Sequence, residues 1–121
     1  MKVFLVEDSA AIRARLHLRV AEAGASVVGE ADNQHDAIHG ICSNPPHLVI
    51  LDLALAEGNG VEVLRCVKSS FPQTKVIILS NYSSAPYRSK CSQLGADYFL
   101  DKNQEFEALG PLLLSEQAVN A

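Results

Sequence analysis

Short apolar runs rich in β-branched residues recur along this chain, and a helical pattern of apolar residues separates each run from the next. The third and fourth runs are apolar at every position, which is typical of central parallel strands covered on both faces. Alternating strands and helices indicate βα units, and right-handed crossovers leave few possible arrangements. We therefore predict an α/β fold, a doubly wound five-stranded parallel sheet flanked by five helices. The strands are expected at Val3–Val6, Val27–Gly29, Leu48–Leu51, Val76–Leu79 and Tyr98–Leu100.

Residues that start or end helices stand between these runs. Side chains suited to the N-cap precede the first three helical patterns, at Ser9, Asn33 and Asn59. Gly24 and Gly95 suit the left-handed conformation that ends a helix. The last segment, from about residue 104, is helical in pattern but contains Pro111, which removes a backbone hydrogen bond. We expect this helix to be short, kinked or restarted at Pro111.

The composition fits one compact domain. Apolar residues make up 48% and charged residues 20% of 121 residues, which are ordinary globular values. No apolar run approaches the roughly 18–20 residues that cross a bilayer, and Val3–Val6 is too short for a secretory signal. We expect a single domain over residues 1–121, located in the cytoplasm, with no output domain and no membrane segment.

Charge and cysteine content exclude further classes. The net charge of −4 disfavours direct nucleic-acid binding, which requires a concentrated positive surface. Cys42, Cys66 and Cys91 form no CxxC pair and give no zinc-site spacing with the histidines. An odd number of cysteines also fits a reducing compartment better than a disulfide framework. We interpret all three as residues of the core or of helix faces.

Polar side chains follow four of the predicted strands. Glu7 and Asp8 follow the first run and Asp52 the third, whereas Ser80 and Lys102 stand at the ends of the fourth and fifth. Ligands of open α/β sheets bind at the carboxyl ends of the strands. Each residue taken singly is more often a turn, cap or surface residue than a functional one. Three carboxylates at one edge repel one another, however, and a structural role alone does not explain them.

A bound cation would relieve this repulsion. Carboxylate oxygens are hard ligands, and Mg²⁺ typically takes one or two carboxylates, keeps several waters and sits beside phosphate. A lysine and a serine hydroxyl can bind phosphoryl oxygens. The residues therefore predict phosphoryl chemistry on Mg²⁺ at this edge of the sheet.

With these residues in place, the whole chain resembles the receiver domain of two-component response regulators, of the chemotaxis-receiver kind. The likeness rests on four segments in family order, KVFLVED at 2–8, LVILDL at 48–53, VIILSN at 76–81 and GADYFLDK at 95–102. It implies the strand order 2-1-3-4-5. It also implies self-catalysed phosphorylation and slow autodephosphorylation rather than a conventional enzyme activity.

The resemblance implies a role for each site residue. Asp52 would be the phosphoacceptor that attacks the phosphohistidine of a sensor histidine kinase or histidine phosphotransfer protein. Glu7, Asp8, Asp52 and the main-chain carbonyl of Ala54 would hold Mg²⁺. Lys102 would pair with the phosphoryl group, and Ser80 would hydrogen-bond one of its oxygens.

Further positions would couple phosphorylation to output. Phe99 fills the position of the switching aromatic residue, and Ala54 and Tyr82 would tune the lifetime of the phosphoryl group. Residues 85–117 would then meet a downstream protein partner. If residues 1–121 are the whole protein, output would pass through that partner or through a phosphorelay. If they are one domain of a longer protein, a DNA-binding domain could follow Ala121, and the sequence does not decide between the two.

Some positions depart from the family pattern. Ala56 stands where the family often has proline, and we expect its turn to be looser. Asn103 replaces the proline that usually follows the lysine, and it resembles a helix cap. The usual glycine is present as Gly60.

Three alternatives to a phosphorylated switch make different demands on the sequence. A pseudo-receiver, an interaction module that is not phosphorylated, would be expected to lack Asp52, Asp8 or Lys102, and all three are present. An aspartyl-nucleophile phosphatase needs a second carboxylate two residues after the nucleophile, where this chain has Ala54. A flavin or dinucleotide module would show a glycine-rich loop after the first strand, and none follows it.

Overall fold

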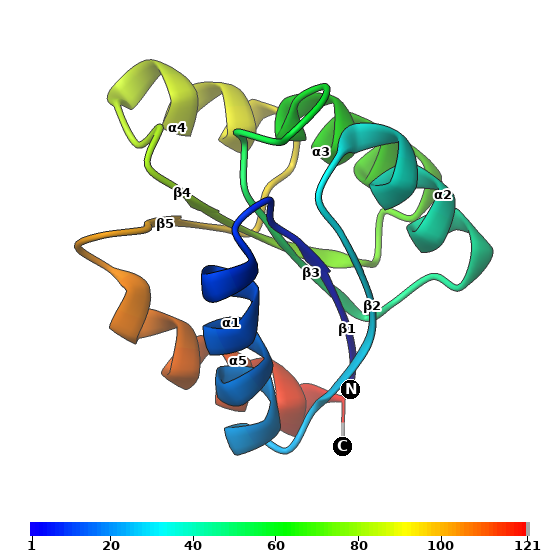
Figure 1. The fold of residues 1–121 in the computed structure, drawn as a ribbon, viewed down its shortest axis with the longest axis vertical. Coiled ribbons are helices and arrows are strands. Elements are labelled where there is room, and N and C mark those ends of the chain that lie inside the picture. Colours follow the sequence, from blue (N-terminus) through cyan, green and yellow to red (C-terminus); the bar gives the residue numbers. More distant parts are fainter. Residues whose placement is uncertain (121) are drawn as a thin grey trace.

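The computed structural model describes residues 1–120 as a parallel sheet between two layers of helices (Figure 1). The elements are β1 (Lys2–Val6), α1 (Ala10–Glu22), β2 (Ser26–Ala31), α2 (Gln34–Ser43), β3 (Leu48–Leu51), α3 (Gly60–Ser70), β4 (Lys75–Ser80), α4 (Ala85–Gln93), β5 (Tyr98–Asp101), the 3-10 turn η1 (Phe106–Ala108) and α5 (Leu109–Val119). All strand pairs are parallel, and the order is β2-β1-β3-β4-β5. The predicted fold class and strand order are confirmed.

The central strands are buried on both faces. Val49 and Leu51 of β3 belong to the apolar cluster beneath α2, α3 and α4, whereas Leu48 and Ile50 belong to the cluster beneath α1 and α5. Successive side chains of a strand point to opposite faces, so a strand between two helical layers must be apolar throughout. This explains the unbroken apolar run of β3.

The predicted helix starts and ends are confirmed. Backbone N–H groups of the first turns donate to Ser9, Asn33 and Asn59, whose side-chain oxygens accept at 3.2, 2.9 and 3.0 Å. Gly24 and Gly95 end α1 and α4 with φ values of 80° and 97°, which glycine adopts without the strain of a Cβ atom.

The edge strand β2 is longer than predicted. It runs from Ser26 to Ala31, which adds one residue before and two residues after the predicted Val27–Gly29. β2 pairs with β1 alone, and its residues alternate between exposed and more buried. Its exposed polar residues are of the kind that loops also contain, so the sequence pattern of this strand is weak.

The C-terminal segment restarts as expected near its proline. The 3-10 turn η1 comes first, and α5 begins at Leu109, so Pro111 lies in the first turn. A missing N–H costs little there, because first-turn N–H groups have no partner within the helix. The prediction of Asn103 as a helix cap is wrong. The N-cap of η1 is Glu105, and its side chain makes no capping hydrogen bond. Asp101 closes the turn before it, since its Oδ1 accepts the N–H groups of Asn103 and Gln104 at 2.9 and 2.8 Å.

The cysteines lie where the sequence predicts. Cys91 is buried in the core beneath α4, whereas Cys42 and Cys66 lie on helices α2 and α3. All three are free thiols. Within residues 1–120, no helix is both long enough and apolar enough to cross a membrane.

Candidate functional site

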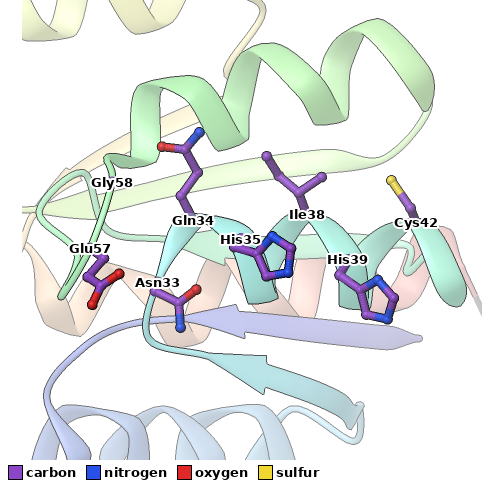
Figure 2. Close-up of a pocket in the computed structure, with 8 residues that line it drawn as sticks. All are labelled: Asn33, Gln34, His35, Ile38, His39, Cys42, Glu57 and Gly58. Carbon is purple, nitrogen blue, oxygen red and sulfur yellow. The ribbon is translucent and has the colours of Figure 1, made fainter.

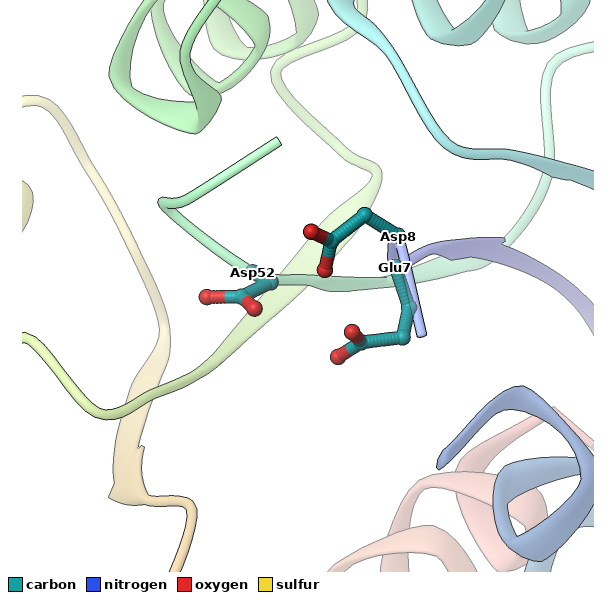
Figure 3. Close-up of side chains that lie close together, drawn as sticks. All are labelled: Glu7, Asp8 and Asp52. Atoms are coloured by element: carbon teal, nitrogen blue, oxygen red, sulfur yellow. The ribbon is translucent and has the colours of Figure 1, made fainter. Parts of the chain in front are cut away.

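Three carboxylates meet where β1 and β3 end. Glu7 and Asp8 follow β1 and Asp52 follows β3, and one oxygen of each lies within 4.8 Å of the others (Figure 3). Glu7 and Asp52 are 1% and 4% exposed, whereas Asp8 is exposed. The strands are parallel neighbours in register, so their carboxyl ends reach the same edge of the sheet. The structure thus brings together the acidic residues that the sequence singled out.

Lys102 closes the pocket from β5. Its Nζ lies 2.5 Å from Oδ2 of Asp52 and 2.8 Å from Oε1 of Glu7, and its side chain is 9% exposed. The Lys102 N–H donates to the carbonyl of Ser80 at 3.0 Å, which fixes the start of this loop against β4. The contact between Lys102 and Asp52 agrees with the prediction that both residues lie at one site on this edge of the sheet. The ion pair with Glu7 was not predicted, because it depends on how two distant loops approach.

Burial and ion pairing shift two pKa values in the pocket. Burial raises the pKa of Glu7, and the hydrogen bonds from Lys102 and from the Ser9 N–H only partly oppose it. Burial would lower the pKa of Lys102, but hydrogen bonds to Asp52 and Glu7 outweigh it, so its pKa lies above the ordinary value. The pocket therefore retains a charged lysine beside carboxylates that are costly to bury.

The loop after β3 holds Asp52 in place. Its Oδ1 accepts the N–H of Ala54 at 3.2 Å, and the N–H of Gly60 donates to the carbonyl of Leu53 at 2.9 Å. A Cβ atom on Gly60 would meet the carbonyl oxygen of Asp52 and lie 2.7 Å from the Cα of Leu53. Helix α3 can begin this close to β3 because Gly60 has no side chain.

The turn at Ala56 is hydrogen-bonded to a neighbouring loop. The N–H of Ala56 donates to the carbonyl of Asp32 at 2.9 Å, which ties this loop to the loop after β2. The N–H of Gln34 likewise donates to the carbonyl of Glu57 at 3.0 Å. Proline has no N–H, so alanine supplies a bond here that the usual residue cannot make.

Ser80 and Tyr82 lie along the loop that follows β4. Ser80 is fully buried, and its hydroxyl accepts the N–H of Tyr82 at 3.1 Å. Tyr82 is 49% exposed, and its ring stacks on that of Tyr87 with centroids 5.3 Å apart. The serine thus stands at the sheet edge as predicted, and the tyrosine lies at the surface.

Arg88 on α4 joins several segments around Phe99, and sequence reasoning missed it. Its guanidinium lies over the Phe99 ring, 4.7 Å from the centroid. It donates to the carbonyls of Ser83 and Phe99 at 2.8 and 3.3 Å and to Glu105 at 2.8 Å. No spacing signals the contacts with Phe99 and Glu105, because these residues lie on other segments, 11 and 17 positions from Arg88.

Asp101 and Glu105 complete this network. Asp101 accepts a hydrogen bond from the hydroxyl of Ser83, and its N–H donates to Glu105 at 2.9 Å. The bond from Ser83 and the N–H of Gln104 lower the pKa of Asp101. The N–H of Asp101 and the Arg88 guanidinium lower the pKa of Glu105. Both carboxyl groups are therefore held ionised beside Arg88.

Replacing Arg88 with alanine should reduce the free energy of unfolding by about 1–2 kcal/mol, because three hydrogen bonds and a cation–π contact are lost. Urea denaturation measures the loss. Arg65→Ala is the matched control, since Arg65 is 49% exposed and makes one ion pair, with Glu62 at 3.5 Å. That variant should stay within about 0.5 kcal/mol of wild type. Equal losses in the two variants would contradict the importance of the network.

Comparison with known proteins agrees with this geometry. The sequence model of the response regulator receiver domain matches residues 3–113. A putative transcriptional regulator of Pseudomonas aeruginosa is 38% identical over 99% of this chain and 56% of its own length. The DNA-binding transcriptional activator DevR/DosR of Mycobacterium tuberculosis is 36% identical over 69% of this chain and 39% of its own. The chain spans about half the length of the first curated relatives that it matches, at 56% and 51%.

Solved structures agree with the sequence relatives. The response regulator domain of Thermotoga maritima CheB superposes with a TM-score of 0.84 at 27% identity, over 100% of this chain and 97% of that one. The signal receiver domain of a putative Luxo repressor protein from Vibrio parahaemolyticus gives a TM-score of 0.83 at 28% identity, over 98% of this chain and 93% of that one. Receiver domains bind Mg²⁺ at an acidic pocket, and this chain carries the acidic group of Glu7, Asp8 and Asp52. The chain belongs to the response regulator receiver domain family of two-component systems.

Proposed function

We propose that this receiver domain is phosphorylated on Asp52, in a Mg²⁺-dependent transfer from the phosphohistidine of a histidine kinase or histidine phosphotransfer protein. The observation that carries the proposal is the contact of the buried Asp52 carboxylate with Lys102, inside a group of three carboxylates. A structural ion pair needs one carboxylate for one lysine. The additional buried Glu7 and exposed Asp8 suit a site that also takes a divalent cation.

The side chains support each part of the transfer. An oxygen of Asp52 attacks phosphorus, an O–P bond forms, the N–P bond of the phosphohistidine breaks, and the imidazole leaves. Lys102 stays charged and can bind a phosphoryl oxygen, because it already contacts Asp52 at 2.5 Å. Bound Mg²⁺ would be held by Glu7, Asp8, Asp52 and the carbonyl of Ala54, and it would neutralise phosphoryl charge. Hard carboxylate oxygens within 4.8 Å of one another fit this ion.

The proposal extends to the output surface. Phosphorylation adds about −1.5 to −2 charges and three acceptor oxygens beside Lys102. The buried hydroxyl of Ser80 would turn toward them, breaking its bond with the Tyr82 N–H, and Phe99 would move into the space behind it. The surface formed by residues 85–117 would then bind a downstream protein.

Two residues would set the lifetime of the phosphoryl group. The N–H of Ala54 donates a hydrogen bond to Asp52, and Tyr82 is half exposed in the loop that follows β4. Both positions flank the proposed path of hydrolytic water. We further propose that residues 1–121 act as one receiver domain. We assign it no direct nucleic-acid contact, because its net charge is −4.

Intact mass after incubation with acetyl phosphate and Mg²⁺ tests the function. The wild type should gain one phosphoryl group, and Asp52→Asn should gain none because the amide cannot accept it. Omission of Mg²⁺ should strongly reduce the gain. Asp32→Asn is the matched control, since Asp32 is an exposed aspartate after β2, and it should be phosphorylated like the wild type. An unchanged wild-type mass would instead favour the pseudo-receiver, an interaction module without phosphorylation.

A further inference from the structure

The four histidines of this chain differ in whether their rings have a polar partner in the protein. Nε2 of His17 lies 2.7 Å from Oε2 of Glu30, and Nδ1 of His47 accepts the N–H of Lys2 at 2.8 Å. His35 and His39 are exposed on α2, and neither ring makes a hydrogen bond to any residue in the range 1–120. Their ring nitrogens are therefore available to a ligand from solvent.

His35 and His39 lie one helical turn apart on the same side of α2. Their rings stand side by side, with centroids 6.4 Å apart and planes 11° from parallel (Figure 2). Ile38 and Cys42 point toward α3, away from the two rings (Figure 2). The rings border a surface cavity of about 580 Å³ that Glu57 also lines. Two histidines four residues apart on a helix can bind one metal ion, as in the zinc sites of helical H-x-x-x-H motifs.

The surrounding charge favours a cation. No lysine or arginine occurs between Arg19 and Arg65. The same stretch contains seven carboxylates, at Glu22, Glu30, Asp32, Asp36, Asp52, Glu57 and Glu62. Asp36 adjoins His35 in the sequence, and Glu57 lies at the same cavity. No lysine or arginine is among the residues that line this cavity, so a cation there meets little electrostatic repulsion.

We propose that His35 and His39 chelate a divalent transition-metal ion of the Zn²⁺ class, at a site separate from the acidic pocket. Imidazole nitrogen suits Zn²⁺, Ni²⁺ and Cu²⁺, whereas Mg²⁺ prefers carboxylate and water oxygen. The site shares no residue with the group of Glu7, Asp8 and Asp52. Both nitrogens must come within about 2.0–2.1 Å of the metal. Rotation of two exposed side chains without hydrogen bonds achieves this at small cost, and water fills the remaining positions.

Isothermal titration calorimetry with Zn²⁺, in excess Mg²⁺ to compete at the acidic pocket, tests the proposal. The wild type should bind one Zn²⁺ ion. His35→Gln and His39→Gln should each weaken binding at least about tenfold, because loss even of an indirect partner of a metal typically costs 10–100-fold. Glutamine keeps a polar side chain on the exposed face of α2, so the fold is preserved.

Matched variants separate this site from the others. His17→Gln and His47→Gln should bind Zn²⁺ like the wild type, since both rings already have protein partners. Asp8→Asn should also leave Zn²⁺ binding unchanged, because Asp8 belongs to the acidic pocket. Binding that survives in His35→Gln or His39→Gln, or that disappears in Asp8→Asn, would overturn the proposal. Phosphorylation of Asp52 is measured separately, so either proposal can fail alone.

Discussion

Replacing Gly60 with alanine should lower the free energy of unfolding by about 3 kcal/mol or more, because the new methyl group has no room. Its Cβ would meet the carbonyl oxygen of Asp52 and lie 2.7 and 2.9 Å from the Cα of Leu53 and the carbonyl carbon of Asp52. These are backbone atoms at the end of a central strand, so they cannot rotate away. The clash outweighs the gain of at most about 1 kcal/mol that alanine brings over glycine in a helix.

Gly110→Ala is the matched control for this prediction. Gly110 also lies in the first turn of a helix, but apart from its chain neighbours and its own helix backbone nothing lies within 4 Å of the position its Cβ would take. Pro111 disfavours the helical conformation of a preceding alanine, whereas alanine also restricts the unfolded chain, so that variant should stay within about 1 kcal/mol of the wild type. Urea denaturation followed by circular dichroism compares the two. A Gly60→Ala protein as stable as Gly110→Ala would show that the loop after β3 adapts readily.

Replacing Lys102 with methionine should cost about 3 kcal/mol of stability near pH 7, because it leaves Glu7 and Asp52 buried without their cation. Burial already raises the pKa of Glu7 in the wild type, against the opposing effect of Lys102. A raised pKa stabilises the folded state below the pKa of the unfolded group, and this stability is lost as pH rises through the folded value. Removing Lys102 raises the pKa of Glu7 further, so the loss extends to higher pH.

The pH dependence distinguishes this cause from simple loss of packing. Unfolding free energies between about pH 8 and pH 5 should recover more steeply for Lys102→Met than for the wild type. The added change Glu7→Gln should restore part of the stability and flatten this dependence, because it removes a buried charge. Lys75→Met is the control, since Lys75 is 47% exposed and lies 3.7 Å from its partner, Asp97. A Lys102→Met protein with the pH profile of the wild type would refute the electrostatic explanation.

Local sequence signals predicted the elements that depend on local physics. Unbroken apolar runs located β3 and β4, because a strand that is buried on both faces carries apolar side chains on both. Capping side chains located the starts of α1, α2 and α3, because they satisfy backbone N–H groups within the same turn. The edge strand β2 was predicted too short, since its exposed face carries polar residues that give no apolar signal.

The candidate site was predictable in its members but not in its contacts. Parallel topology sends the residues after β1, β3 and β5 to one edge, so Glu7, Asp52 and Lys102 could be placed together from strand positions alone. The additional ion pair between Lys102 and Glu7 depends on the packing of two loops that are far apart in the sequence. The residue type of Asn103 suggests a helix cap, whereas in the structure η1 begins after Glu105, and Asp101 closes the turn that contains Asn103.

The amino-acid order alone specified the alternation of strands and helices, and with it the edge of the sheet at which the acidic residues and the lysine collect. Apolar periodicity and helix capping depend on interactions between residues close in the sequence, so they can be recognised without a structure. Only the tertiary structure placed Arg88 against Phe99, tied Ala56 to Asp32 and pressed Gly60 against Asp52. Such contacts join residues from separate segments, and they depend on the distances between packed layers, which no local pattern records.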